Sequence, residues 1–89
     1  MTPREYLSRV HELDCVLCGA SPVSAHHIRT GQGMAQKASD FLTVALCPEC
    51  HQGPTGIHGD RTLLRVYKVT ELDLLARTIA GVHKLRDRT

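Results

Sequence analysis

Cys47-Pro48-Glu49-Cys50, the second of two Cys-x-x-Cys pairs in this chain, decides the fold. The first pair is Cys15-Val16-Leu17-Cys18, and residues 19–46 separate the two. Each pair forms a turn that presents two thiolates to one ion, and zinc takes four such ligands in a tetrahedron. The intervening segment is long enough for a β-hairpin whose two ends return to the metal. The sequence therefore predicts one structural zinc, which also stabilises the fold.

Four cysteines could instead form two disulfides or remain free thiols. The N-terminus, Met1-Thr2-Pro3-Arg4-Glu5, carries charges where the apolar part of a signal peptide would begin. No stretch is apolar for long enough to cross a membrane. We therefore expect a cytoplasmic protein without a membrane partner, where thiols stay reduced and zinc is favoured. The chain has only 89 residues and no Trp, so a metal would supplement a small aliphatic core.

The segments beside the cysteine pairs predict a small α+β fold. Thr2, Pro3 and Glu5 have the pattern of a capped helix start, which predicts a short N-terminal helix. Two apolar, β-branched stretches predict strands over residues 23–28 and 41–46, and the second strand leads directly into the second cysteine pair. One helical turn is then expected over the second pair itself.

Two further helices are expected at the C-terminal end. Asp60 is expected to cap the first and Thr70 the second. The last helix has apolar residues at spacings of three and four, which are Leu72, Leu75, Ile79 and Val82. This stripe either covers the domain's own core, which we favour, or joins two chains, so the oligomeric state stays open.

Four histidines lie close to the cysteines in sequence. His26 and His27 are adjacent in the first predicted strand, His51 follows the last cysteine, and His58 comes seven residues later. Adjacent strand residues point to opposite faces, so one of the pair could bind a metal while the other faces a substrate. A lone histidine is usually a surface or core residue. An adjacent pair together with one beside the cysteines indicates a functional site.

Three segments together resemble the HNH nucleases, which have a ββα-metal core. They are Cys15-x-x-Cys18, Ala25-His26-His27-Ile28 and Leu46-Cys47-Pro48-Glu49-Cys50-His51. The similarity is to the subtype in which four cysteines hold a structural zinc. The continuation, Gly53-Pro54-Thr55-Gly56-Ile57-His58-Gly59, most resembles phage and prophage HNH proteins of the recombination-enhancement (Ref) type. The resemblance covers about residues 13–60. The chain length suits one small domain, so we expect a single domain over residues 1–89, with this core and flanking C-terminal helices at about 60–85.

The resemblance also implies a role for each matching residue. His26 would bind a catalytic divalent metal, which is Mg²⁺, Mn²⁺ or another ion, and His27 would be the general base. His51 would supply a further ligand, and His58 would be another if the Gly-Pro-Thr-Gly turn brings it back. Arg29 follows the histidine pair and could clamp a phosphate, although a solvated surface position is the simpler interpretation.

The sequence departs from the HNH pattern at one position. The family's middle letter is an asparagine that orients the base, and this chain contains no Asn. Asp40, Thr43 or a backbone carbonyl must then take that role. Gly31 and Gly33 would let the loop after the histidine pair approach a nucleic-acid backbone.

The resemblance implies a metal-dependent endonuclease that nicks or cleaves DNA with little sequence specificity. Ref-type proteins further imply recombination-related cleavage in a bacterial or phage-infected cell, with a recombinase filament as a second partner. The net charge is +2, and many basic residues lie in the last third, which suits either a phosphate backbone or solvated helix faces. One alternative is a catalytically inactive zinc module that binds nucleic acid or protein. Another is a plain zinc ribbon, in which His26 and His51 would lie far apart.

Overall fold

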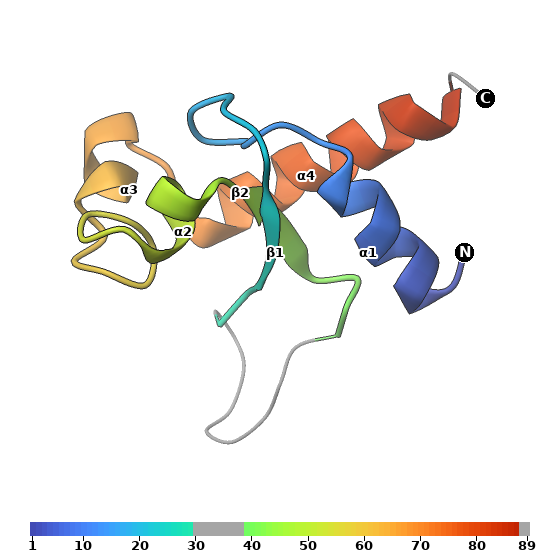
Figure 1. Cartoon of the computed structure of the whole chain (residues 1–89), viewed down its shortest axis with the longest axis horizontal. Coiled ribbons are helices and arrows are strands. Elements are labelled where there is room, and N and C mark those ends of the chain that lie inside the picture. Colours follow the sequence, from blue (N-terminus) through green and yellow to red (C-terminus); the bar gives the residue numbers. More distant parts are fainter. Residues whose placement is uncertain (30–38, 88–89) are drawn as a thin grey trace.

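The structure is a computed structural model that describes residues 1–29 and 39–87. This part of the chain forms a two-stranded sheet and four helices, which confirms the small α+β domain. In chain order the elements are α1 (Pro3–His11), β1 (Ser24–His27), β2 (Thr43–Leu46), α2 (Pro48–Gln52), α3 (Thr62–Tyr67) and α4 (Glu71–Asp87). The hairpin lies at the centre, and α1 and the long α4 pack against it. The helices α2 and α3 lie on the opposite side of the hairpin from α1 (Figure 1).

The N-terminal helix begins where its cap predicts. The Thr2 hydroxyl accepts a hydrogen bond from the Glu5 amide at 3.1 Å, and Pro3 occupies the first helical position. α1 then packs against both strands and α4, so it closes one side of the domain. Its buried residues are Tyr6 and Val10.

The two strands pair in antiparallel register and are shorter than predicted. Ser24 lies opposite Leu46, and His27 lies opposite Thr43. The second strand begins at Thr43 because the preceding residues form a turn, closed by a 2.8 Å hydrogen bond from the Leu42 amide to the Ser39 carbonyl. This turn brings residue 40 next to the end of β1.

β2 is the centre of the core, because its residues are completely buried. Successive side chains of a strand point to opposite faces, so β2 contributes to two apolar clusters. Val44 and Leu46 join the cluster that contains three of the cysteines and Leu74. Ala45 joins the smaller cluster that α1 covers. Because β2 is buried on both faces, it places the next residue, Cys47, inside the domain.

Both C-terminal helices start near the predicted caps. The Asp60 carboxylate accepts the Thr62 amide at 2.9 Å, but the N-cap position belongs to Arg61, whose backbone is left-handed at φ 63°. At α4 the capping is reciprocal. The Asp73 amide donates to the Thr70 hydroxyl at 3.2 Å, and the Thr70 amide donates to the Asp73 carboxylate at 2.8 Å.

The predicted core stripe of α4 is wrong in half of its members. Leu75 and Val82 are buried, but Leu72 is 50% exposed and Ile79 is 38% exposed. The helix is turned so that a different set faces inward, which is Glu71, Leu74, Leu75, Thr78 and Val82. The polar Thr78 satisfies its hydroxyl inside the core by donating to the Leu74 carbonyl and accepting the Ala45 amide.

Some sequence expectations fall outside the described residues. The loop glycines Gly31 and Gly33 lie there, as does Arg88 in the basic C-terminal third. None of the helices within residues 1–29 and 39–87 is long and apolar enough to span a membrane.

Candidate metal centre

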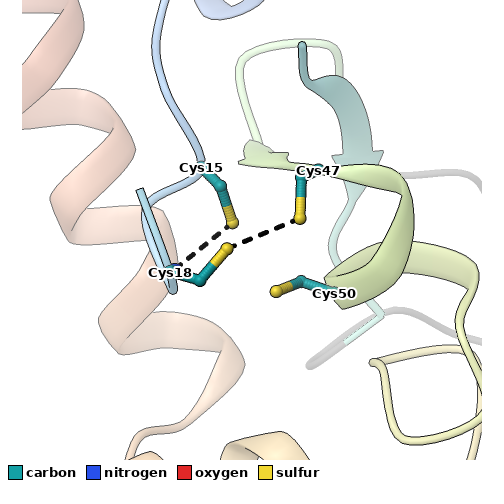
Figure 2. Close-up of side chains that lie close together, drawn as sticks. All are labelled: Cys15, Cys18, Cys47 and Cys50. Carbon is teal, nitrogen blue, oxygen red and sulfur yellow. Dashed lines mark hydrogen bonds between the residues drawn. The ribbon is translucent and has the colours of Figure 1, made fainter. Parts of the chain in front are cut away.

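The four cysteines converge on one point. Their sulfur atoms all lie within 4.8 Å of one another, and Cys18 Sγ is 3.5 Å from Cys47 Sγ. The sulfurs face one another across the space between the first loop and the start of α2 (Figure 2). A tetrahedral ion with metal–sulfur bonds of about 2.3 Å requires sulfurs about 3.8 Å apart. A disulfide would need about 2.05 Å, and all four cysteines are free. The quartet therefore has the geometry of a metal site.

The thiols of the quartet differ in acidity. Burial raises the pKa of Cys15, but backbone hydrogen bonds to its sulfur outweigh that effect and lower it to about 7. Burial and the neighbouring sulfurs raise the pKa of Cys50 well above its usual value. Four thiolates this close repel one another, so a cation at their centre is what would let all four ionise.

Three of the histidines form a second cluster. One ring nitrogen each from His26, His51 and His58 lies within 4.8 Å of the others, and His26 Nδ1 is 3.3 Å from His58 Nε2. Tetrahedral coordination with metal–nitrogen bonds of about 2.0–2.1 Å requires nitrogens about 3.3–3.4 Å apart. The ring centroids of His26 and His51 are 5.2 Å apart, which contradicts the plain-ribbon alternative. This histidine trio can hold a second ion.

His58 reaches the trio because the loop over residues 53–59 folds back onto α2. The His58 amide donates to the His51 carbonyl at 3.0 Å, and the Ile57 amide donates to the Cys50 carbonyl at 2.8 Å. Gly56 permits the close approach to α2, and Gly59 permits the tight packing within the loop itself. A Cβ on Gly56 would lie 2.6 Å from the Cys50 carbonyl oxygen, and one on Gly59 would lie 2.2 Å from that of Pro54.

Contacts outside the trio orient two of the three rings, those of His26 and His51. His26 Nε2 lies 2.7 Å from a carboxylate oxygen of Glu71, and both side chains are about 2–3% exposed. His51 Nδ1 lies 2.7 Å from the Ser24 hydroxyl, which also contacts the Leu46 carbonyl at 3.4 Å. If each of these ring nitrogens donates, the lone pairs remain on His26 Nδ1 and His51 Nε2. Those are the nitrogens available to an ion.

The electrostatics of the trio favour neutral imidazoles. Burial, together with the smaller effect of the neighbouring His26 and His58, lowers the pKa of His51 to about 4. Burial also lowers the pKa of His26, although the Glu71 carboxylate opposes this. Metal binding requires unprotonated imidazole, so both rings are ready to coordinate at neutral pH.

His27 lies on the opposite side of β1, as the strand alternation predicts. Its Nε2 is 2.7 Å from Asp40 Oδ1, and the two side chains are 24% and 36% exposed. Of the side chains considered as substitutes for the missing asparagine, Asp40 therefore contacts the imidazole directly. Thr43 instead donates to the Asp40 carbonyl at 3.0 Å and steadies the turn. Arg29, two residues after His27 in the sequence, is exposed.

The family comparison covers nearly all of this arrangement. A family model described as "Protein of unknown function (DUF968)" matches residues 1–81. The chain belongs to the DUF968 family. The matched region contains the cysteine quartet, the histidine trio and most of α4. No curated protein and no solved structure matches the chain.

The sequence of this DUF968 domain does not indicate the roles of two side chains at the site. Glu71 lies in the first turn of α4, where a carboxylate is favoured by the helix dipole alone, and no sequence motif includes Ser24. Both instead hold histidines of the trio. For Glu71 the sequence offers no local signal, because its partner His26 lies 45 residues away. Ser24 lies two residues before His26 in β1, and a strand places such residues on one face.

Proposed function

We propose that this DUF968 protein is a metal-dependent endonuclease of the HNH type, in which β1, β2 and α2 form the ββα-metal core. The observation that carries the proposal is that two adjacent strand residues have different surroundings. His26 faces two other histidines, while His27 faces the opposite way and is held by a carboxylate. A site that binds an ion and activates a water beside it needs both arrangements.

Zinc is the ion that we assign to the quartet of Cys15, Cys18, Cys47 and Cys50. Four thiolates in a tetrahedron favour zinc over harder cations, and such closed sites are structural. Because α2 carries Cys50 and His51 side by side, this zinc would also fix one member of the histidine trio. The cysteine quartet and the histidine trio would then be connected through α2.

A divalent ion is proposed at His26, His51 and His58, whose donor set fits one. Imidazole nitrogens suit Mn²⁺, Co²⁺, Ni²⁺ or Zn²⁺ better than Mg²⁺, which prefers oxygen ligands. When bound, such an ion supplies Lewis-acid stabilisation of a phosphodiester and its leaving oxygen. The histidines themselves would hold that ion through three ring nitrogens and leave positions for substrate.

His27 is the proposed general base. Its Nε2 is engaged by Asp40, so Nδ1 is the nitrogen that would take a proton from the attacking water. Histidine is the side chain most often used for general acid–base catalysis. Asp40 would take the orienting role of the family's asparagine, and the exposed Arg29 would contact a phosphate oxygen.

DNA is the proposed substrate. The exposed basic residues of the C-terminal third support contact with the phosphate backbone, and few elements offer base readout, so we expect little sequence specificity. The resemblance to Ref-type proteins extends the proposal to recombination in a bacterial or phage-infected cytoplasm, with a recombinase filament as a second partner.

Nicking of supercoiled plasmid tests the enzymatic proposal. With Mn²⁺, Mg²⁺, Co²⁺ or Zn²⁺ added in turn, at least one ion should support nicking by the wild-type protein. His27→Ala should lower the rate about 100-fold or more, because the proton acceptor is lost, while metal content and DNA binding persist. His83→Ala is the matched control, since that histidine is exposed on α4 and should leave the rate unchanged.

A catalytically inactive module that binds nucleic acid or protein is the second candidate. The absence of asparagine from the chain favours it. Failure of every divalent ion to support nicking, with DNA binding intact, would establish this function in place of the nuclease.

A further inference from the structure

The Glu71 carboxylate is a buried charged group that has no role in the proposed function. It is 4% exposed, although it belongs to the first turn of a helix whose neighbours Leu72 and Asp73 are exposed. A carboxylate is costly to bury unless several donors surround it. Here one oxygen lies 2.7 Å from His26 Nε2 and the other accepts the Arg29 amide at 2.9 Å. Both oxygens are therefore held at the end of β1.

We propose that Glu71 is a positioning residue that fixes the tautomer and orientation of His26, so that His26 offers Nδ1 to a divalent metal ion. The proposal rests on the proposed function, because it requires the histidine trio to bind an ion. Glu71 is not itself a ligand in this arrangement. Its contact is with Nε2, while the nitrogen that meets His58 at 3.3 Å is Nδ1.

The physical reason is the choice between two neutral tautomers. A neutral imidazole carries one proton, and the nitrogen beside a carboxylate is the one that keeps it. The proton on Nε2 then leaves the lone pair on Nδ1, facing His58 and His51. Carboxylates that accept the second N–H of a ligating histidine orient the ring and raise its basicity, and their loss typically weakens metal affinity about 10–100-fold.

The arrangement also connects the C-terminal helix to the site. Residue 71 opens α4, and the Thr70–Asp73 capping box fixes where that helix starts. The buried Leu74 and Leu75 of the same turns anchor the helix in the core. The orientation of His26 therefore depends on the docking of α4, although no ligand comes from that helix.

A Co²⁺ titration of protein that already holds one zinc tests this proposal. Glu71→Gln should weaken Co²⁺ binding about 10–100-fold, since an amide cannot accept from both donors. Glu12→Gln is the control, because it makes the same substitution at an exposed position just after α1, where the carboxylate pairs with Arg9 and does not touch His26. It should change Co²⁺ affinity less than about twofold. Equal losses in the two variants, or no loss in Glu71→Gln, would overturn the proposal.

A second measurement needs no variant. In ¹H–¹⁵N spectra of the wild-type protein with its zinc bound and the trio free of metal, His26 should be the Nε2–H tautomer at neutral pH. An Nδ1–H tautomer would overturn the proposal. These readouts are independent of nicking, so a protein that binds Co²⁺ through a Glu71-dependent site but cleaves no DNA would support this inference and refute the nuclease.

Discussion

At the scale of single residues, His26 and His27 show how a strand separates two chemical tasks. They are adjacent in sequence, yet one is 2% exposed and faces other histidines, while the other is partly exposed and faces a carboxylate. The alternation of side chains along β1 is sufficient to explain this. What the alternation does not specify is the partner of each ring, and those partners decide which nitrogen is free.

Replacement of Asp40 tests the orientation of the proposed base. Asp40→Ala should lower the nicking rate about 10–100-fold, because His27 loses the acceptor that fixes its ring. Asp40→Asn should lose less, since an amide oxygen can still accept from Nε2 and asparagine is the residue of the HNH pattern. The rates are compared at saturating metal on supercoiled plasmid. An alanine variant as active as the wild type would remove Asp40 from the site.

The acidity of His51 predicts a specific pH dependence of stability. Its folded pKa of about 4 lies below the unfolded value near ~6.5, so the fold favours the neutral ring. This contribution is complete above about pH 6.5 and is lost as the pH falls towards 4. Between pH 7 and 5 the wild-type protein should lose about 1–2 kcal/mol more unfolding free energy than His51→Gln, allowing for partial solvent screening.

Denaturant unfolding of both proteins, with the trio free of metal, measures that difference. Zinc loss from the cysteines at low pH affects both proteins and cancels in the comparison. Parallel pH profiles for wild type and His51→Gln would show that burial beside His26 and His58 does not depress the His51 pKa as described.

Residue-scale prediction from the sequence worked where the signal was local. The cysteine spacing predicted the convergence of four sulfurs, and the capping pattern at Thr70 predicted the start of α4. Glu71 was out of reach, because its partner is brought by the tertiary docking of α4. The helix dipole alone explains a carboxylate at the start of a helix, so the sequence pattern does not indicate that Glu71 also binds a distant side chain.

At the scale of elements, the loop over residues 53–59 is the piece that completes the trio. It folds so closely that none of its three glycines leaves room for a Cβ: Gly53 and Gly56 lie against α2, and Gly59 lies against the start of the loop itself. The sequence predicted the turn from its Gly-Pro-Thr-Gly pattern. The backbone hydrogen bonds from Ile57 and His58 to α2 explain why the turn returns to His51 rather than leaving into solvent.

Gly59→Ala tests this element. Its Cβ would lie 2.2 Å from the Pro54 carbonyl oxygen, so the loop must shift and carry His58 away from His26. Co²⁺ affinity of the trio should fall at least about tenfold, the lower end of the usual effect of disturbing a ligand's support. Gly81→Ala is the control. Gly81 lies within α4, and its Cβ would meet only the flexible Leu13 side chain, at 3.1 Å. Co²⁺ affinity should therefore persist. Unchanged affinity in Gly59→Ala would contradict the role of the loop.

The orientation of α4 was predicted less well than its position. Spacings of three and four also fit the stripe of Leu72 and Ile79, which the structure leaves exposed. The inward face instead includes the polar Thr78 and the charged Glu71. Hydrophobicity alone could not select that face, because two of its members are buried through hydrogen bonds to distant backbone and side-chain groups.

At the scale of the whole molecule, two candidate metal centres share one short helix. α2 supplies Cys50 to the quartet and His51 to the trio, and β2 delivers the chain to Cys47 through the core. A structural zinc contributes folding free energy on the order of 10 kcal/mol or more in small domains. We therefore expect the trio to require the quartet, whereas the quartet should bind its zinc without the trio.

Native mass spectrometry of the metal-loaded protein tests the central claim most directly. The wild-type chain should carry two divalent ions, one in the quartet and one in the trio. A variant with His26, His51 and His58 all replaced by alanine should stay folded and carry one. A wild-type chain that carries a single ion at saturating Co²⁺ or Zn²⁺, or a triple variant that still carries two, would contradict the account.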